Sequence, residues 1–293
     1  MRARLRRAAR SRPRAAASGV TTDWKTELAQ AFGPVANIEP VSGGDINLAW
    51  RVELTDGRSL FVKTHSSAPP GMYAAEAAGL AWIGGGPLRV PRVVVACDSF
   101  LALEWLDLGA RGGRAFEAEL GRGLAGLHRR GAPAFGHTGT SFLATLAQDN
   151  TAEDDVVTHW IERRVRPLCT RAKLGLDRQL DALAQRRDRF GPRESPARLH
   201  GDLWWGNVVA SGGAPVLIDP AVYGGHREVD LAMLALFGGI SDAVIDAYSE
   251  VWPLDPGWRE RVPVWQLYPL AAHAVLFGGG YGAQVARLLA SLT

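Results

Sequence analysis

Short runs of alternating apolar and polar residues dominate the first third of the chain, and this period of two is typical of half-buried β-strands. Such runs lie at residues 48–54, 59–64, 90–96 and 100–105. Asp56-Gly57 between the first two runs favours a hairpin turn, because these residues tolerate positive φ. Residues 23–32 and 72–83 have helical spacing instead. The pattern predicts a small, mostly antiparallel sheet with one helix inserted between the strands at residues 59–64 and 90–96.

Helical spacing predominates from residue 114 to the end of the chain. The segments concerned are residues 116–129, 156–174, 177–190, 229–237, 241–251 and 258–290. Two short strand-like pieces, at residues 199–209 and 214–219, lie around a loop. We therefore predict an α+β fold with two lobes. Residues 21–106 would form a small N-terminal lobe with an antiparallel sheet, and residues 107–293 a larger, mainly helical C-terminal lobe.

The net charge of +3 comes from an arginine-rich segment at the start of the chain. Residues 1–18 hold seven arginines and no acidic residue, so without them the formal charge is −4. We predict a disordered tail at residues 1–20, because this composition does not support a core. A targeting peptide is the alternative, although the segment lacks the apolar region of a secretory signal. The mildly acidic body argues against a specific nucleic-acid partner.

No apolar run in the sequence is long enough to span a membrane. The two cysteines, Cys97 and Cys169, lie far apart and form neither a disulfide framework nor a metal-binding motif. A reducing compartment suits such sparse cysteine usage. We therefore expect a cytoplasmic protein that does not associate with membranes, and we expect it to be a monomer.

The segment at residues 200–207 reads HGDLWWGN and lies within the first of the two strand-like pieces. Asp202 is placed to accept a proton from an attacking hydroxyl group, and Asn207 to bind Mg²⁺ through its amide oxygen. Asp219 follows an apolar strand, where a carboxylate is costly to bury without a cation. Asp and Asn also form ordinary turns. The complete spacing nevertheless favours phosphoryl transfer, which requires a bound metal and a positioned acceptor.

Two features in the N-terminal half would hold phosphate groups. Gly43 and Gly44 form a glycine-rich turn whose backbone NH groups can approach a phosphate closely, although a plain tight turn is the alternative. Lys63 ends an apolar strand, and Glu76 on the following helix is placed to orient it. A surface position is the usual alternative for a single lysine. The chain has only three lysines, however, and this scarcity favours a functional role for Lys63.

The chain resembles the protein-kinase-like fold and, more narrowly, the fructosamine kinase (ketosamine 3-kinase) family. The narrow resemblance rests on residues 199–208, LHGDLWWGNV, and on residues 216–233, VLIDPAVYGGHREVDLAM. Residues 41–47, VSGGDIN, and 60–63, LFVK, support it, and it extends over essentially everything after the tail. The resemblance implies phosphorylation of a ketosamine sugar hydroxyl, the 3-hydroxyl in the family. The unstable product then releases the amine, so the activity removes sugars from glycated amines.

The resemblance also implies the cofactors and the role of each chemical group. ATP would donate the phosphoryl group, and Mg²⁺ would be held by Asn207 and Asp219. Asp202 would act as the base, while Lys63 would contact the nucleotide phosphates and pair with Glu76. The acceptor would be a small-molecule or protein-bound ketosamine.

Further site residues follow from the same resemblance. The connector Glu104-Trp105-Leu106 would offer backbone groups to adenine. Trp204 would form an aromatic wall beside the sugar, with core packing as its alternative, and His226 is a second candidate for the substrate site. Trp205 stands where many relatives have a smaller residue, which would narrow the pocket.

The acidic residue at position 230 is expected to brace the loop that begins at His200. Asp230 would accept hydrogen bonds from backbone NH groups near His200. The alternative for residues 226–230 is an ionic network at the start of a helix. Both interpretations place Asp230 beside the proposed catalytic loop rather than in contact with a substrate.

Three other functions compete with a ketosamine kinase. An aminoglycoside- or choline-type kinase shares the pattern at residues 200–207, but residues 216–233 argue against it. A nucleotide-binding pseudokinase would be expected to have lost one of the four central polar residues, and all four are present: Lys63, Asp202, Asn207 and Asp219. Nucleic-acid binding through the arginine-rich tail is weakened by the acidic body.

Overall fold

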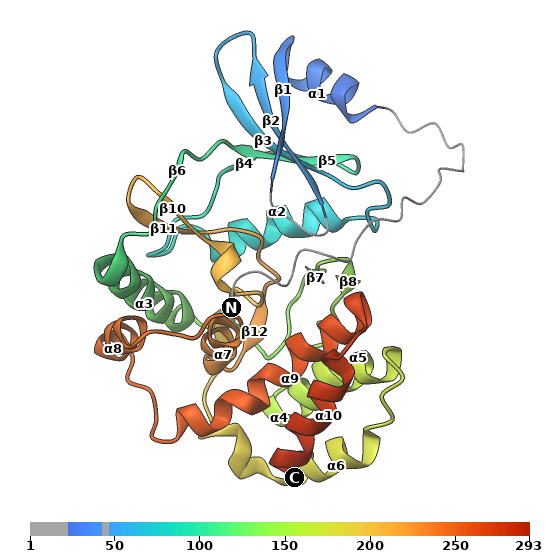
Figure 1. Cartoon of the computed structure of the whole chain (residues 1–293), viewed down its shortest axis with the longest axis vertical. Coiled ribbons are helices and arrows are strands. Elements are labelled where there is room, and N and C mark those ends of the chain that lie inside the picture. The colour runs from blue at the N-terminus through green and yellow to red at the C-terminus, as the bar shows by residue number, and fades with distance from the viewer. Residues whose placement is uncertain (1–22, 43–46) are drawn as a thin grey trace.

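A five-stranded antiparallel sheet forms the N-terminal part of the molecule, and helices form most of the rest (Figure 1). The computed structural model describes residues 23–42 and 47–293. Gly43, Gly44 and the arginine-rich tail at residues 1–20 lie outside the described residues. The predictions for these segments therefore stay predictions.

The sheet has the strand order β1-β2-β3-β5-β4, and every neighbouring pair is antiparallel. Its strands are β1 (Val35–Val41), β2 (Leu48–Leu54), β3 (Ser59–Thr64), β4 (Val93–Ala96) and β5 (Phe100–Glu104). Alternate residues of β3 face opposite sides, as the sequence pattern requires. Leu60 and Val62 pack in one core with Leu28 of helix α1 (Trp24–Phe32). Phe61 packs against helix α2 (Met72–Ile83) on the other face.

Helix α2 lies below the sheet in Figure 1, between the sheet and the helical part of the molecule. Short strands and a turn of 3₁₀-helix surround the predicted catalytic loop, which lies between β9 and β10. They are β6 (Leu108–Gly109), β7 (Phe142–Leu143), β8 (Leu146–Ala147), β9 (Ala197–Leu199), η3 (Trp205–Asn207), β10 (Val208–Ser211), β11 (Ala214–Leu217) and β12 (Tyr223–Gly225). Strand β9 pairs with β12, and β10 pairs with both β11 and β6. Residues 200–207 therefore leave one small antiparallel pair and enter another.

The helical part contains α3 (Gly113–Arg129), α4 (Val156–Thr158), the π-helix η1 (His159–Val165), α5 (Arg166–Arg171), α6 (Asp177–Gln185), the 3₁₀-helix η2 (Arg187–Phe190), α7 (Glu228–Leu236), α8 (Asp242–Val251), α9 (Trp258–Phe277) and α10 (Tyr281–Leu292). Helix α3 packs on α8, and α9 packs on both α7 and α10. Trp160 and Trp265 meet edge to face, with 5.1 Å between ring centroids, in the main core. None of the described helices is long and apolar enough to cross a membrane.

The predicted α+β fold class is confirmed, and residues 258–290 are mainly helical, as the sequence predicts. The structure has two helices there, α9 and α10, joined by three glycines. Gly278 and Gly279 adopt positive φ angles of 64° and 62°, which end α9 and allow α10 to turn back onto it. The apolar spacing continues through both helices, so spacing alone does not reveal the break. The lobe boundary at residues 106 and 107 stays a prediction.

Candidate active site

The carboxylate of Asp230, at the start of α7, holds the first residues of the predicted catalytic loop. It accepts hydrogen bonds from the backbone NH of His200 at 2.8 Å and of Gly201 at 2.9 Å. Burial alone would raise the pKa of Asp230, but a hydrogen bond from buried His128 and further polar contacts hold it below its usual value. The brace that the sequence suggested for Asp230 is therefore present.

Gly201 turns the chain at a point where no other residue fits. Its φ is +81°, and a Cβ atom there would lie 2.1 Å from the carbonyl oxygen of Ala221. That carbonyl belongs to the segment after Asp219, and the NH of Ala221 donates to the carbonyl of His200 at 2.8 Å. The close approach therefore joins the catalytic loop to the segment that carries the second predicted metal ligand.

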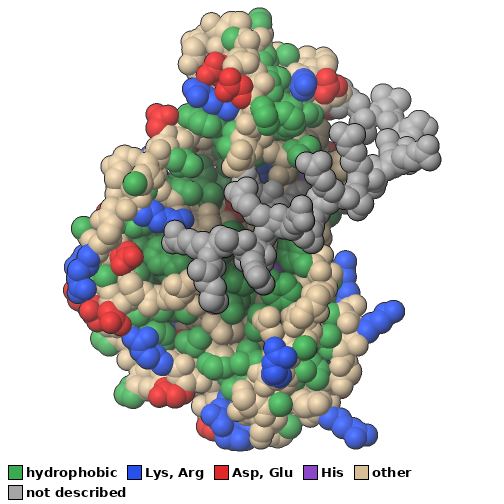
Figure 2. All heavy atoms as spheres, in the orientation of Figure 1, with side chains coloured by type: hydrophobic (Ala, Val, Ile, Leu, Met, Phe, Trp, Pro, Cys, Tyr) green, Lys and Arg blue, Asp and Glu red, His purple; other side chains and the backbone are tan. Residues whose placement is uncertain are grey.

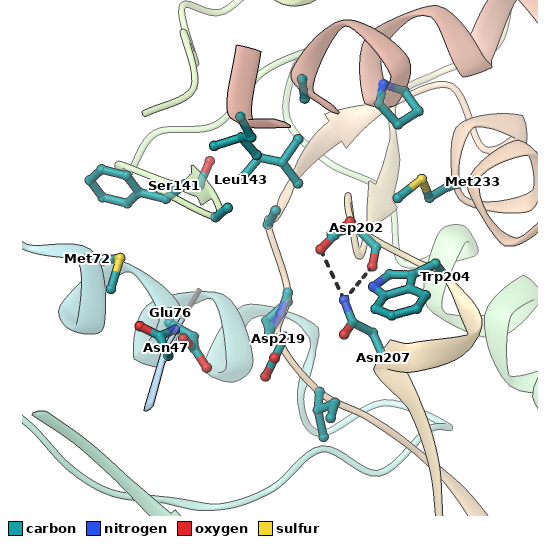
Figure 3. A pocket seen from close by; sticks show the side chains of 18 of the residues that line it. Asn47, Met72, Glu76, Ser141, Leu143, Asp202, Trp204, Asn207, Asp219 and Met233 are labelled. Carbon is teal, nitrogen blue, oxygen red and sulfur yellow. Dashed lines mark hydrogen bonds between the residues drawn. The ribbon is translucent and has the colours of Figure 1, made fainter. Parts of the chain in front are cut away.

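Asp202 and Asn207 face each other across the loop (Figure 3). The Nδ2 group of Asn207 donates to the carbonyl oxygen of Asp202 at 2.8 Å and to its Oδ2 at 3.1 Å. Because a carbonyl oxygen only accepts, this contact fixes the orientation of the Asn207 amide. Burial, and then the nearby charge of Asp219, raises the pKa of Asp202 to about 7. A carboxylate with a pKa near neutrality is suited to general base catalysis.

Lys63 joins the sheet, helix α2 and the segment after β11. Its Nζ lies 2.6 Å from Oε1 of Glu76 and also pairs with Oδ1 of Asp219. Burial would lower the pKa of Lys63, but the two carboxylates raise it above its usual value. The lysine is therefore a cation held in a buried position, with its charge balanced by two carboxylates.

Asp219 has a left-handed backbone conformation, with φ of +57°. This conformation is costly for a residue other than glycine, and such strain commonly occurs at functional sites. Hydrogen bonds hold the chain on both sides, since Ile218 NH donates to the carbonyl of Asn207 and Ala221 NH to that of His200. The strained backbone directs the Asp219 carboxylate towards Lys63.

These side chains surround one cavity of about 480 Å³ between the sheet and the helices. On the face shown in Figure 2, hydrophobic side chains gather in the region between the sheet and the helices. The polar residues that line the cavity are Asn47, Lys63, Glu76, Ser141, Asp202, Asn207, Asp219 and His273. A cavity of this size, mostly apolar and with a few convergent polar groups, is typical of small-molecule sites.

Of the ten predicted site residues that the structure describes, six line this cavity. Those that line it are Lys63, Glu76, Asp202, Trp204, Asn207 and Asp219. Glu104, Trp105 and Leu106 are not among the lining residues. Glu104 ends β5, and its carboxylate accepts hydrogen bonds from Arg89 at 2.9 Å and from the backbone NH of Arg92 at 3.2 Å. The proposed adenine contact at this connector involves backbone groups and stays a prediction.

Two sequence-based expectations differ from the structure. His226 does not line the cavity, because its ring is buried and stacks on Trp265 with 4.8 Å between ring centroids. Trp205 does not narrow the cavity either. Its Nε1 donates to the carbonyl of Gly239 at 2.9 Å, and its ring lies beneath the guanidinium of Arg111. Neither side chain is placed to contact a ligand of this cavity.

Other lining residues were not anticipated from the sequence. The hairpin of β7 and β8 contributes Ser141, Phe142, Leu143 and Ala144, and one face of α9 contributes Pro269, Ala272, His273, Leu276 and Phe277. Phe237 lies just after α7. The spacing along α9 identifies an apolar face, but nothing local shows that this face lines a cavity rather than a core.

The fold and the cavity define a protein-kinase-like phosphotransferase. The model of one family, described as fructosamine kinase, matches residues 18–293. The chain belongs to the fructosamine kinase family.

Curated relatives agree with this assignment over most of their length. A probable ketoamine kinase from Enterococcus faecium is 37% identical over 268 residues, which cover 85% of this chain and 93% of the relative. The chloroplastic protein-ribulosamine 3-kinase of Arabidopsis thaliana is 33% identical over 274 residues, covering 87% of this chain and 82% of the relative.

Solved structures show the same relationship. A protein from Thermobifida fusca, provisionally named a fructosamine-3-kinase, has a TM-score of 0.81 and 39% sequence identity, with 91% of this chain and 97% of that chain covered. A macrolide 2′-phosphotransferase from Brachybacterium faecium has a TM-score of 0.60 at 15% identity, over 90% of this chain and 95% of that one. The second likeness shows the shared fold alone.

Proposed function

We propose that this protein transfers the γ-phosphoryl group of ATP to a sugar hydroxyl of a ketosamine, and that the unstable product then releases the amine. The observation that carries the proposal is the convergence of Lys63, Asp202, Asn207 and Asp219 on one cavity. Membership of the fructosamine kinase family and the names of the relatives support the choice of acceptor.

Asp202 is the proposed catalytic base. Its carboxylate lines the cavity, and its raised pKa of about 7 allows it to take a proton at neutral pH. The acceptor hydroxyl would lose its proton to Asp202 as its oxygen forms the bond to phosphorus and ADP leaves. Asn207 restrains the Asp202 carboxylate through the 3.1 Å hydrogen bond to Oδ2, which limits the directions from which the hydroxyl can approach.

Lys63 is proposed to contact the nucleotide phosphates, with Glu76 as its orienting partner. Their 2.6 Å contact fixes the ammonium at the cavity wall. Phosphoryl transfer depends chiefly on such positioning and on electrostatic stabilisation. The proposal also retains Gly43 and Gly44 as phosphate contacts and residues 104–106 as the adenine contact.

The residues present suit Mg²⁺. Because Nδ2 of Asn207 faces Asp202, its Oδ1 is the atom available to a cation. Asp219 adds a carboxylate on the same cavity, and one or two carboxylates plus substrate phosphates are the usual ligands of Mg²⁺. Asn207 and Asp219 are therefore the proposed ligands. The ion would neutralise negative charge on the phosphates.

Trp204 is the proposed wall of the sugar site. Its side chain lies beside Asp202 and Asn207 in Figure 3 and lines the cavity. An aromatic face there suits the apolar C–H surface of a sugar whose hydroxyl reaches Asp202. His226 is not retained in this role, because it is buried away from the cavity.

We also propose that the protein is a cytoplasmic monomer without a specific nucleic-acid partner. The support for this proposal is the scarcity of cysteine and the acidic charge of the chain without its first 18 residues. Size-exclusion chromatography with light scattering tests the oligomeric state, and a stable dimer at micromolar concentration would overturn that part.

An acceptor panel tests the proposed function. The full chain, with Mg-ATP, is offered fructose- and ribose-derived ketosamines, an aminoglycoside, a macrolide and choline, and phosphorylated product is detected by mass. Transfer to the ketosamines is expected. Good transfer to an antibiotic or to choline, with none to any ketosamine, would show that the fold serves another acceptor. ATP binding without transfer to any acceptor would indicate a pseudokinase.

A further inference from the structure

Four aromatic rings form a continuous surface at one end of the cavity. Trp204 and Phe237 have ring centroids 6.4 Å apart, Phe237 and His273 5.1 Å apart, and His273 and Phe277 5.4 Å apart. All four residues line the cavity, together with Leu276. In Figure 3, Trp204 and Met233 lie beyond Asp202 as seen from Glu76. The aromatic surface thus begins with Trp204, beside the proposed base, and continues through Phe237 and His273 to Phe277.

Three of the four rings in this surface are exposed. Trp204 is 40% exposed, Phe237 38% and Phe277 50%. Exposed apolar groups are ordinary when scattered, but a contiguous set in a cavity marks a binding surface. The four rings are direct neighbours of one another, so together they could cover a ligand ring.

The charges around the cavity limit which ligands suit this end. Among the described residues that line it, Lys63 is the only Lys or Arg, and Lys63 already pairs with Glu76 and Asp219. A carboxylate on the acceptor would therefore find no free arginine or lysine partner among these residues. A protonated amine is favoured instead, because aromatic faces attract cations.

The chemistry of a ketosamine places its amine near this surface. In transfer to the 3-hydroxyl, the nitrogen is attached two carbons along from the carbon that carries the reacting oxygen. With that oxygen at Asp202, the nitrogen and whatever it carries extend only a short way from Asp202. Trp204, two residues along the chain, begins the aromatic surface on which the substituent of the nitrogen could rest.

We propose that Phe237, Leu276 and Phe277 form a subsite for the substituent on the ketosamine nitrogen, and that the preferred acceptors are ketosamines of apolar amines, especially aromatic ones. This inference rests on the proposed function. The subsite would favour these acceptors over adducts of free amino acids, whose carboxylate lies close to the nitrogen. The subsite selects the amine, whereas Asp202 and Trp204 act on the sugar.

The test compares three fructose adducts, those of benzylamine, methylamine and glycine, through kcat/KM with Mg-ATP. Because the subsite would bury the benzyl ring, kcat/KM for the benzylamine adduct is expected to exceed that for the methylamine adduct by at least about tenfold. The glycine adduct should be the poorest. Phe237→Ala and Phe277→Ala should each reduce the benzylamine-to-methylamine ratio severalfold, and Phe237→Leu, which keeps an apolar side chain, should reduce it less.

Leu108→Ala is the matched control, because Leu108 is an apolar residue, 63% exposed, that does not line the cavity. It should leave the ratio at the parent value. Equal use of the benzylamine and methylamine adducts, or a preference for glycine, would overturn the subsite while leaving the proposed function intact. The subsite is also overturned if the two Phe→Ala variants lower both adducts in parallel. Transfer to none of the three adducts would overturn both proposals.

Discussion

Lys63 on strand β3 and Glu76 on helix α2 are joined by a 2.6 Å ion pair in which both side chains are largely buried. Asp219, after strand β11, pairs with the same ammonium. Burial raises the pKa of Glu76, and the charge of Lys63 opposes that effect. The lysine therefore has two roles, since it balances a buried carboxylate and presents a cation to the cavity.

Replacing Lys63 should separate these two roles. Lys63→Met leaves Glu76 buried without its partner, and we expect a loss of about 3 kcal/mol in the free energy of unfolding. The double variant Lys63→Met/Glu76→Gln should recover most of that stability, because no buried charge remains unpaired, yet its phosphoryl transfer should stay at least about 100-fold below the parent. Urea denaturation and initial rates measure the two effects. Restored activity in the double variant would show that Lys63 has only a structural role.

Arg111 holds the backbone on both sides of Asn207. Its Nε donates to the carbonyl of Val208 at 3.1 Å, its Nη2 donates to that of Trp205, and its guanidinium lies over the Trp205 ring. A lysine keeps the charge but cannot form the same pair of bonds. Arg111→Lys should therefore lower kcat about tenfold, because small displacements of a catalytic group are costly. The Mg²⁺ concentration at half-maximal rate should rise.

Arg114→Lys is the control for that measurement. Arg114 lies three residues away, is largely exposed and pairs with exposed Asp246 at 3.6 Å. Its substitution should leave kcat and the Mg²⁺ dependence unchanged. If the two lysine variants behaved alike, Arg111 would not be positioning Asn207.

His226 should make the fold sensitive to acid. Burial lowers its pKa to about 3, whereas an unfolded histidine titrates near 6.5. The unfolded chain therefore binds the extra proton first, so stability falls as pH decreases below about 6.5, by about 2 kcal/mol at pH 5 from this residue alone. His226→Phe keeps a ring against Trp265 and should reduce the loss between pH 7 and pH 5 by that amount. An unchanged pH dependence of the urea midpoint would contradict this account.

The sequence predicts the fold class and the polar centre of the site because both depend on residue patterns within short segments of the chain. The alternation around Lys63 places it on a strand, the helical spacing places Glu76 on the next helix, and residues 200–207 carry Asp202 and Asn207 together. Each of these relationships spans a few residues, or two adjacent elements. The structure adds the geometry, including the left-handed backbone of Asp219.

The apolar end of the cavity depends on packing between distant elements and was not predictable in the same way. Phe237 and Phe277 come from the ends of α7 and α9, and Trp204 meets Phe237 only because the catalytic loop lies against α7. The burial of His226 has a similar origin, since its ring stacks on Trp265 from a different helix. Periodicity identifies apolar faces, but it does not show which of them a neighbouring element leaves uncovered.

The most direct test of the central claim is the mass of the product formed from Mg-ATP and the methylamine adduct of fructose, with the parent protein and with Asp202→Asn. We expect a singly phosphorylated ketosamine from the parent, and a rate lowered about 100- to 10,000-fold in the variant. Nucleotide binding measured by calorimetry should change little, because Asp202 acts on the acceptor. No phosphorylated ketosamine from the parent, or a near-parental rate from Asp202→Asn, would contradict the claim.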